Sequence, residues 1–113
     1  MIRAIESKGK TLISIVDVQR IDKNNILELS NSLEGHIKKN HELFLNLNKV
    51  FFIDAEGFLS LLDIQKKAKK VSCTIKLFQI SDALSELFNL MELYDKFEWA
   101  SPEHLEDPAF CNF

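Results

Sequence analysis

The stretch Val50–Leu62, VFFIDAEGFLSLL, decides how this chain folds. An apolar run ends at Asp54, a glycine follows at Gly57, and apolar residues then resume. Aspartate is a preferred N-cap residue, so this pattern predicts a helix over residues 55–70 that begins directly after Asp54. The first half of that helix is apolar nearly all round, which indicates burial on more than one side. Its second half carries lysines, which suit the negative end of the helix dipole.

On both sides of this stretch, segments with the periodicity of strands alternate with segments that have the periodicity of helices. The chain opens with a predicted hairpin that turns at Gly9–Lys10. Two later helical stripes follow the predicted N-caps Asp22 and Ser81. The expected strands are residues 3–8, 11–18, 42–48, 73–80 and 96–99, and the expected helices are residues 23–39, 55–70 and 82–94, with a short helix or turn at Ser101–Pro102.

This order of elements defines a fold class. Strands that are joined through helices imply right-handed crossovers and parallel pairing, whereas the opening hairpin is antiparallel. The sequence therefore predicts an α/β fold in which a mixed sheet of four to five strands carries three to four helices. The length of 113 residues suits one domain. Cys73, at the start of a strand, is expected to be a small buried hydrophobe.

Composition and charge argue against several classes of protein. The chain is 46% hydrophobic and 27% charged, which is ordinary for a soluble globular protein. Its formal charge of -3 argues against a nucleic-acid binder, because such proteins usually carry a basic stripe. Two cysteines without C-x-x-C spacing suit a reducing cytoplasm, and the N-terminus lacks the apolar core of a signal peptide.

Membrane insertion and metal binding are not expected either. No apolar run approaches the roughly 18 residues that are needed to span a bilayer. The three histidines, His36, His41 and His104, share no helical metal-ligand spacing. The sequence therefore predicts neither a metal site nor a cofactor.

The two carboxylates of the opening stretch, Asp54 and Glu56, leave three roles open: a catalytic acid pair, an anion-binding helix start, or a docking surface. Residues two apart in a helix do not face each other, and no histidine or nucleophile lies near them in sequence, so the chain is not expected to be an enzyme. As a surface charge in the first turn, Glu56 contributes about 0.3–1 kcal/mol. The phenylalanines around this stretch are expected in the core more often than at a contact surface, because a strand-loop-helix junction buries apolar side chains. Among them Phe58 is the best candidate for an exposed aromatic anchor, and Ser60 is the nearest downstream hydroxyl.

Four segments of the chain resemble the STAS domain, the family of sulfate-transporter domains and anti-sigma factor antagonists. The central segment, LNLNKVFFIDAEGFLSLL, resembles the family's signature of a strand, then Asp-Ser-Ser-Gly or Asp-Ala-Ser-Gly, then a leucine-rich helix. The other segments are RID, TIKLFQIS and LFNLMELYDKFEW, which begin at Arg20, Thr74 and Leu87. The resemblance implies a single STAS domain over residues 1–113, with a core of about residues 3–100 and a short tail over residues 101–113.

In the small bacterial antagonists of this family, the residue before the motif glycine is a serine or threonine that a partner anti-sigma factor phosphorylates. The unphosphorylated form binds the anti-sigma factor, and the phosphorylated form releases it. This chain carries Glu56 at that phosphoacceptor position, between Ala55 and Gly57. Glutamate adds one permanent charge where phosphoserine adds about 1.5 to 2, so Glu56 resembles a partial phosphomimetic, whether it is native or was engineered in place of serine.

The resemblance thus implies a cytoplasmic, non-catalytic, partner-switching regulator. Its implied partners are an anti-sigma factor or a serine kinase of that type, and a serine phosphatase, but no nucleic acid. The alternative is a STAS adaptor subunit of a membrane transport complex, which needs no phosphoserine switch. One departure from the family is Leu59, where a small residue is frequent. The residues expected to shape the docking surface around Glu56 are Asp22, Asp54, Ala55, Gly57, Phe58 and Ser60.

Overall fold

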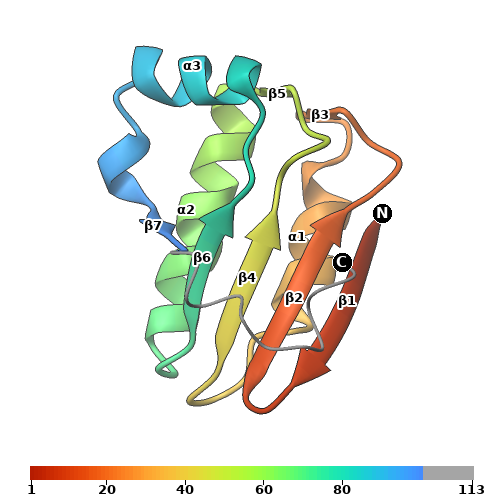
Figure 1. Ribbon diagram of the computed structural model, residues 1–113, viewed down its shortest axis with the longest axis vertical. Helices are drawn as coiled ribbons and strands as arrows, with labels where there is room; N and C mark the ends of the chain where they lie inside the picture. The colour runs from red at the N-terminus through yellow and green to blue at the C-terminus, as the bar shows by residue number, and fades with distance from the viewer. Residues whose placement is uncertain (101–113) are drawn as a thin grey trace.

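A five-stranded mixed sheet forms the centre of the molecule, as the sequence predicts. The structure is a computed structural model that describes residues 1–100, so the short helix or turn expected at Ser101–Pro102 and the predicted tail lie outside the described residues. The strand order is β1-β2-β4-β6-β7, and β1 alone runs antiparallel to its neighbour (Figure 1). The strands are β1 Ile2–Ser7, β2 Lys10–Ile15, β4 Glu42–Asn46, β6 Thr74–Phe78 and β7 Glu98–Trp99.

The opening hairpin turns one residue earlier than predicted, at Lys8–Gly9 instead of Gly9–Lys10. Ser7 pairs with Lys10 across the hairpin, so only two residues form the connection. Both have positive φ, 50° for Lys8 and 79° for Gly9. A two-residue turn with positive φ at both positions matches the twist of its strands, and glycine adopts this conformation at little cost. Lys10 is thereby free to begin β2.

All three predicted helices are present, together with a 3-10 helix η1 at Tyr94–Lys96. Helix α2 spans Ala55–Lys69 and α3 spans Asp82–Leu90, close to their predicted bounds. Ser81 caps α3 as predicted, because its Oγ accepts a hydrogen bond from the Leu84 amide at 3.1 Å.

Helix α1 is the exception, because it spans only Ile26–Glu34 and its N-cap is Asn25. The prediction that Asp22 caps this helix is wrong. The Asp22 side chain accepts a hydrogen bond from the amide of Asn24, two residues on, and so stabilises a turn before the helix. Gly35 ends α1 as its C-cap.

The main core lies between the sheet and helices α1 and α2, which cover the same face of the sheet (Figure 1). Alternate residues of β4 divide between the two faces: Leu43 and Leu45 pack in the main core, whereas Phe44 joins a second cluster on the opposite face. Cys73 is fully buried, as predicted, and burial raises the pKa of its thiol. The thiol therefore behaves as part of the apolar core.

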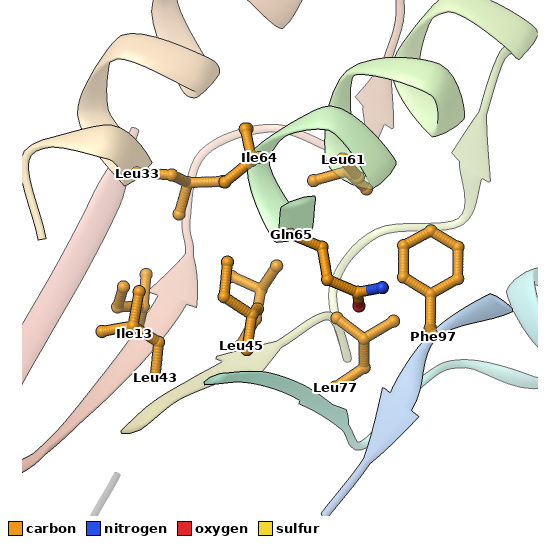
Figure 2. Close-up of a pocket in the computed structure, with 10 residues that line it drawn as sticks. Ile13, Leu33, Leu43, Leu45, Leu61, Ile64, Gln65, Leu77 and Phe97 are labelled. Atoms are coloured by element: carbon orange, nitrogen blue, oxygen red, sulfur yellow. The ribbon is translucent and has the colours of Figure 1, made fainter. Parts of the chain in front are cut away.

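A void lies inside the main core, next to the side chain of Gln65 (Figure 2). Its volume is about 10 Å³, which is room for at most one water molecule. Gln65 Nε2 donates to the Lys96 carbonyl oxygen at 3.0 Å, while its buried Oε1 has no hydrogen-bond partner among residues 1–100. The void is too small for a cofactor or a metabolite.

A second, two-stranded sheet was not predicted. Strand β3, Arg20–Ile21, pairs in parallel with β5, Phe52–Ile53. It lies beyond the C-terminal ends of β2 and β4, beside the start of α2 (Figure 1). Two-residue strands carry no readable periodicity, so only the tertiary structure reveals them. This small sheet positions the candidate site.

No helix within residues 1–100 combines the length and apolar character that crossing a membrane requires.

Phe88 of α3 should be a main determinant of stability, because it contacts three aromatic rings edge-on. Its ring centroid lies 5.1 Å from Phe58, 5.5 Å from Phe97 and 5.3 Å from Trp99. We expect Phe88→Ala to lower the free energy of unfolding by about 3–5 kcal/mol in urea denaturation. Leu90 in the same helix is 80% exposed, and Leu90→Ala should change stability by less than about 0.5 kcal/mol. Equal losses for both variants would contradict this view of the core.

Candidate functional site

The first turn of α2 begins at a well-formed cap, as predicted. Asp54 has an extended backbone, with φ -81° and ψ 176°, and its Oδ1 accepts a hydrogen bond from the Gly57 amide at 2.8 Å. An N-cap carboxylate satisfies one of the free amides at the helix start and favours the positive end of the dipole. The sequence stretch that predicts the fold therefore also fixes where the candidate site begins.

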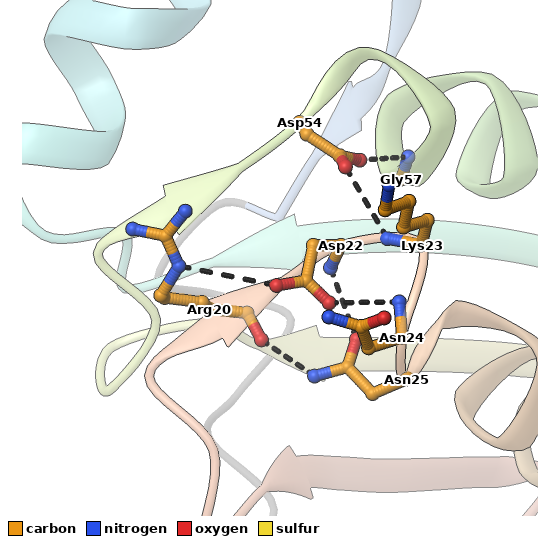
Figure 3. A network of polar contacts seen from close by, with 7 residues as sticks. All are labelled: Arg20, Asp22, Lys23, Asn24, Asn25, Asp54 and Gly57. Atoms are coloured by element: carbon orange, nitrogen blue, oxygen red, sulfur yellow. Dashed lines mark hydrogen bonds and ion pairs between the residues drawn. The ribbon is translucent and has the colours of Figure 1, made fainter.

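The second carboxylate oxygen of Asp54 joins α2 to the neighbouring loop. Asp54 Oδ2 accepts a hydrogen bond from the main-chain amide of Lys23 at 3.2 Å (Figure 3). The amide of Asp54 in turn donates to the carbonyl oxygen of Ile21 at 3.0 Å. The loops that precede α1 and α2 therefore form one unit at one end of the sheet, and Asp22 lies in it.

Short polar side chains hold the loop before α1 in shape (Figure 3). Asn25 Oδ1 accepts from the Asp22 amide at 3.0 Å, and Asn25 Nδ2 donates to the Arg20 carbonyl oxygen at 2.7 Å. The Arg20 guanidinium lies 4.4 Å from the centre of the Phe52 ring, and its Nε lies 3.9 Å from Asp22 Oδ2. Sequence reasoning missed Asn25, although an Asn-Asn pair after an aspartate is a typical turn signal.

Gly57 is needed because α2 approaches the small sheet very closely. A Cβ atom at this position would lie 2.7 Å from Ile53 Cγ2, 3.1 Å from Ile21 Cγ2 and 3.2 Å from the Ile21 carbonyl oxygen. Distances below 3.0 Å are not tolerated between carbon atoms without movement. Any larger residue would push the first turn of α2 away from β3 and β5.

The prediction that Phe58 is an exposed aromatic anchor is wrong. Phe58 is 2% exposed and packs edge-on against Phe88. It follows Gly57 on the buried side of α2, so the close approach of the helix carries it into the core. Phe51 is the ring that reaches solvent instead, with 50% exposure, because it precedes β5 in the connecting loop.

The exposed surface of the first two turns of α2 consists of Ala55, Glu56 and Leu59. Glu56 makes no hydrogen bond or ion pair with any residue in the range 1–100. Leu59 is 66% exposed and lies three residues after Glu56, so the two side chains are neighbours on the helix surface. Ser60 is partly buried and lies four residues after Glu56. A charge without a partner among residues 1–100 thus lies next to an exposed apolar side chain.

The carboxylate of Asp54 has a structural role in this arrangement. Both carboxylate oxygens of Asp54 accept main-chain hydrogen bonds, so this residue acts as a structural cap. Within residues 1–100, no three His, Cys, Asp or Glu side chains gather in a way that could hold a metal ion. The site presents a capped helix start whose Glu56 carboxylate pairs with no other side chain in the described part of the chain.

Comparison with known proteins agrees with this fold. The family model of the STAS domain matches residues 4–106, and the chain therefore belongs to the STAS domain family. No curated protein matches the chain in sequence.

Several solved structures share the fold at low sequence identity. An anti-sigma factor antagonist (STAS) domain protein from Planctomyces limnophilus has a TM-score of 0.75 and 15% identity, over 91% of this chain and 92% of its own. The anti-sigma factor antagonist SpoIIAA in its unphosphorylated form has a TM-score of 0.68 and 14% identity, over 92% and 91%. A sulfate transporter family protein from Wolinella succinogenes has a TM-score of 0.63 and 18% identity, over 80% and 73%.

Replacing Gly57 should test the close approach of α2 to the small sheet. We expect Gly57→Ala to lower the free energy of unfolding by about 1–3 kcal/mol, because the backbone oxygen of Ile21 cannot move aside easily. Gly35→Ala is the matched control, since its Cβ would meet nothing closer than 3.4 Å and its φ is -63°. Alanine there should be neutral or stabilising by up to about 1 kcal/mol. Chemical denaturation measures both, and a Gly57→Ala variant as stable as the parent would contradict the packing argument.

Proposed function

We propose that this chain is a non-catalytic partner-switching protein of the anti-sigma factor antagonist type. Its docking surface is the N-terminal end of α2 together with the loop that precedes α1. Its partner is an anti-sigma factor with serine kinase activity, and a serine phosphatase would complete such a switch. Glu56 occupies the position of the phosphoacceptor and holds the chain in a state that resembles the phosphorylated one.

The exposure of Glu56 carries this proposal. The carboxylate lies in the first turn of α2, directly before Gly57, and no positive side chain within residues 1–100 pairs with it. A phosphoserine there would add about 1.5 to 2 negative charges, against one for glutamate. A partner that buries this turn must either supply a cation or leave the carboxylate unpaired, and an unpaired buried charge costs about 2–5 kcal/mol.

The residues around Glu56 divide by role. Ala55 and Leu59 are exposed and can touch a partner directly, and Ser60 lies at the margin of the same surface. Asp22 and Asp54 hold the two loops in place. Gly57 and Phe58 lie on the buried side of α2 and set how closely the helix packs against the small sheet and the core. Leu59 thus takes the place of Phe58 as the apolar anchor.

An adaptor role in a membrane transport complex is the second candidate. A carboxylate cannot be phosphorylated or dephosphorylated as a serine can, so a native Glu56 suits a STAS domain that binds its partner permanently. The fold similarity to a sulfate transporter family protein supports this alternative at the level of architecture. In that role the charge of Glu56 would contribute to a fixed interface.

Binding measurements on three forms of the protein should separate these roles. If Glu56 imitates the phosphorylated state, Glu56→Ala should bind the anti-sigma factor encoded in the same gene neighbourhood at least about tenfold more tightly than the parent chain. Glu56→Ser should bind equally tightly and also become a substrate of the kinase. Isothermal titration calorimetry gives the affinities, and transfer of labelled phosphate from ATP gives the modification.

Asp82 provides a matched control, because it is an exposed acid in the first turn of α3. Asp82→Ala removes the same charge from a neighbouring helix start and should leave the affinity within about twofold of the parent. A parent chain that binds as tightly as Glu56→Ala would exclude the switch. Co-purification with transporter subunits instead would then establish the adaptor role.

A further inference from the structure

Exposed apolar side chains gather at the C-terminal end of α3 and on η1. In Figure 1, no other element of residues 1–100 lies beyond α3 at this end of the molecule. Leu90 is the most exposed large apolar residue in the described part of the chain, and Met91 and Tyr94 are 38% and 43% exposed. Single exposed apolar residues are ordinary in soluble proteins, whereas neighbouring ones form a patch that is typical of an interaction surface.

This patch follows the helical period along one side of α3 that the core does not use. Leu84 and Phe88 form the buried side of the helix. Ala83, Leu87 and Leu90 have the spacing i, i+4 and i+7, so they lie on one side of the helix. Ala83 is exposed and Leu87 is partly buried at the margin of the core. Helix α3 is therefore apolar on a second side, and packing against the sheet does not account for it.

The patch is held in shape before any partner binds. The amide of Leu93 donates to the carbonyl oxygen of Phe88 at 2.9 Å and so closes the end of α3. The Tyr94 ring stacks on Trp99, with the ring centres 4.4 Å apart and an interplanar angle of 15°. Trp99 Nε1 also donates to the Tyr94 carbonyl oxygen at 2.8 Å. An aromatic side chain that is already ordered loses little conformational entropy when a partner binds.

Negative charge surrounds the patch. Glu86, Glu92 and Asp95 are exposed, and none of them forms an ion pair with any residue in the range 1–100. Glu86 lies one helical turn before Leu90, so the two side chains are neighbours on the helix surface. Lys96 is the only basic residue in α3, η1 and the turn between them. The complementary surface is therefore apolar at its centre and positively charged at its edge.

The form of the partner follows from the groups that α3 offers. The main chain of the helix bonds within the helix, so it presents no sheet edge to an extended partner. A helix of the partner that carries apolar residues every three to four positions matches a stripe with the same spacing. A second copy that used the same patch would bring carboxylates against carboxylates, and an anionic membrane would repel them, so neither suits this charge.

We propose that this surface of α3 and η1 binds a basic amphipathic helix of a partner protein. The apolar side of that helix covers Leu90, Met91 and Tyr94, and its lysines or arginines pair with the surrounding carboxylates. Glu56 is not part of this surface, so the proposal does not depend on the role of that residue.

Fluorescence anisotropy with a labelled amphipathic peptide of leucine and lysine tests the proposal. We expect saturable binding that weakens as salt is added, because exposed charges are screened. Leu90→Ala should weaken binding at least about tenfold, since it removes the centre of the patch. Leu27→Ala is the matched control, because Leu27 is 72% exposed on α1 and lies outside the patch. It should change the affinity by less than about twofold.

Glu92 allows a test in which stability and binding change in opposite directions. Its φ of 56° is a left-handed conformation that glycine adopts more easily. Glu92→Gly should therefore raise the melting temperature by roughly 2–6 °C and still weaken peptide binding about threefold or more. Ser72→Gly is the matched control, because Ser72 has a φ of 58° after α2. It should raise the melting temperature similarly and leave the affinity unchanged.

Several outcomes would overturn the proposal. Equal losses of affinity in Leu90→Ala and Leu27→Ala would show that the peptide binds elsewhere, as would amide shifts in NMR spectra that lie outside α3 and η1. Equal binding of a peptide with glutamate in place of lysine would exclude the charge pairing. Dimerisation in sedimentation velocity that Leu90→Ala abolishes would assign the patch to a second copy of this chain instead.

Discussion

The close approach of α2 to strands β3 and β5 is the constraint on which this end of the molecule depends. Gly57 allows it, because any Cβ at that position would collide with Ile53 and with the main chain of Ile21. Asp54 then fixes the contact, since its two carboxylate oxygens accept main-chain hydrogen bonds from α2 and from the loop before α1. Steric contact at Gly57 sets the distance between α2 and the small sheet, and the hydrogen bonds of Asp54 set the direction of the helix. The exposed surface around Glu56 rests on this junction.

The rigidity of the junction explains how a single charge could act as a switch. The loop before α1 is held by Asn25 and Asp22, and the start of α2 is held by Asp54. When a partner approaches such a surface, the backbone cannot move slightly to carry the carboxylate away from an unfavourable contact. In the proposed switch, the unfavourable energy of the buried charge therefore lowers the affinity for the partner and leaves the fold unchanged. Phosphorylation of a serine at this position would act by the same local electrostatics.

Local signals predicted much of this structure. Asp54 and Ser81 could be identified as helix caps because the signal is local: a capping residue is followed directly by apolar residues at helical spacing. The pair β3 and β5 could not be found in this way, because each strand is two residues long and exists only through its partner. Phe58 was the candidate for an exposed ring, and the prediction failed for a related reason. The direction of its ring depends on how deeply α2 sits, and that depth is set by Gly57 against Ile21, a contact between distant segments.

The two ends of the sheet present opposite chemistry from one rigid core. Near the C-terminal ends of β2, β4 and β6 lie an exposed leucine and a carboxylate that pairs with no side chain within residues 1–100, whereas the N-terminal ends carry Lys8, Lys10 and Lys76. The strands between them are held in continuous register, from Lys10 with Glu42 and Thr74 at one end to Ser14 with Asn46 and Phe78 at the other. A register of this kind cannot shift by one residue without turning core side chains to solvent. A partner bound around Glu56 therefore has no low-energy sliding motion of the strands by which to alter the opposite end of the sheet, and its effect is expected to stay local.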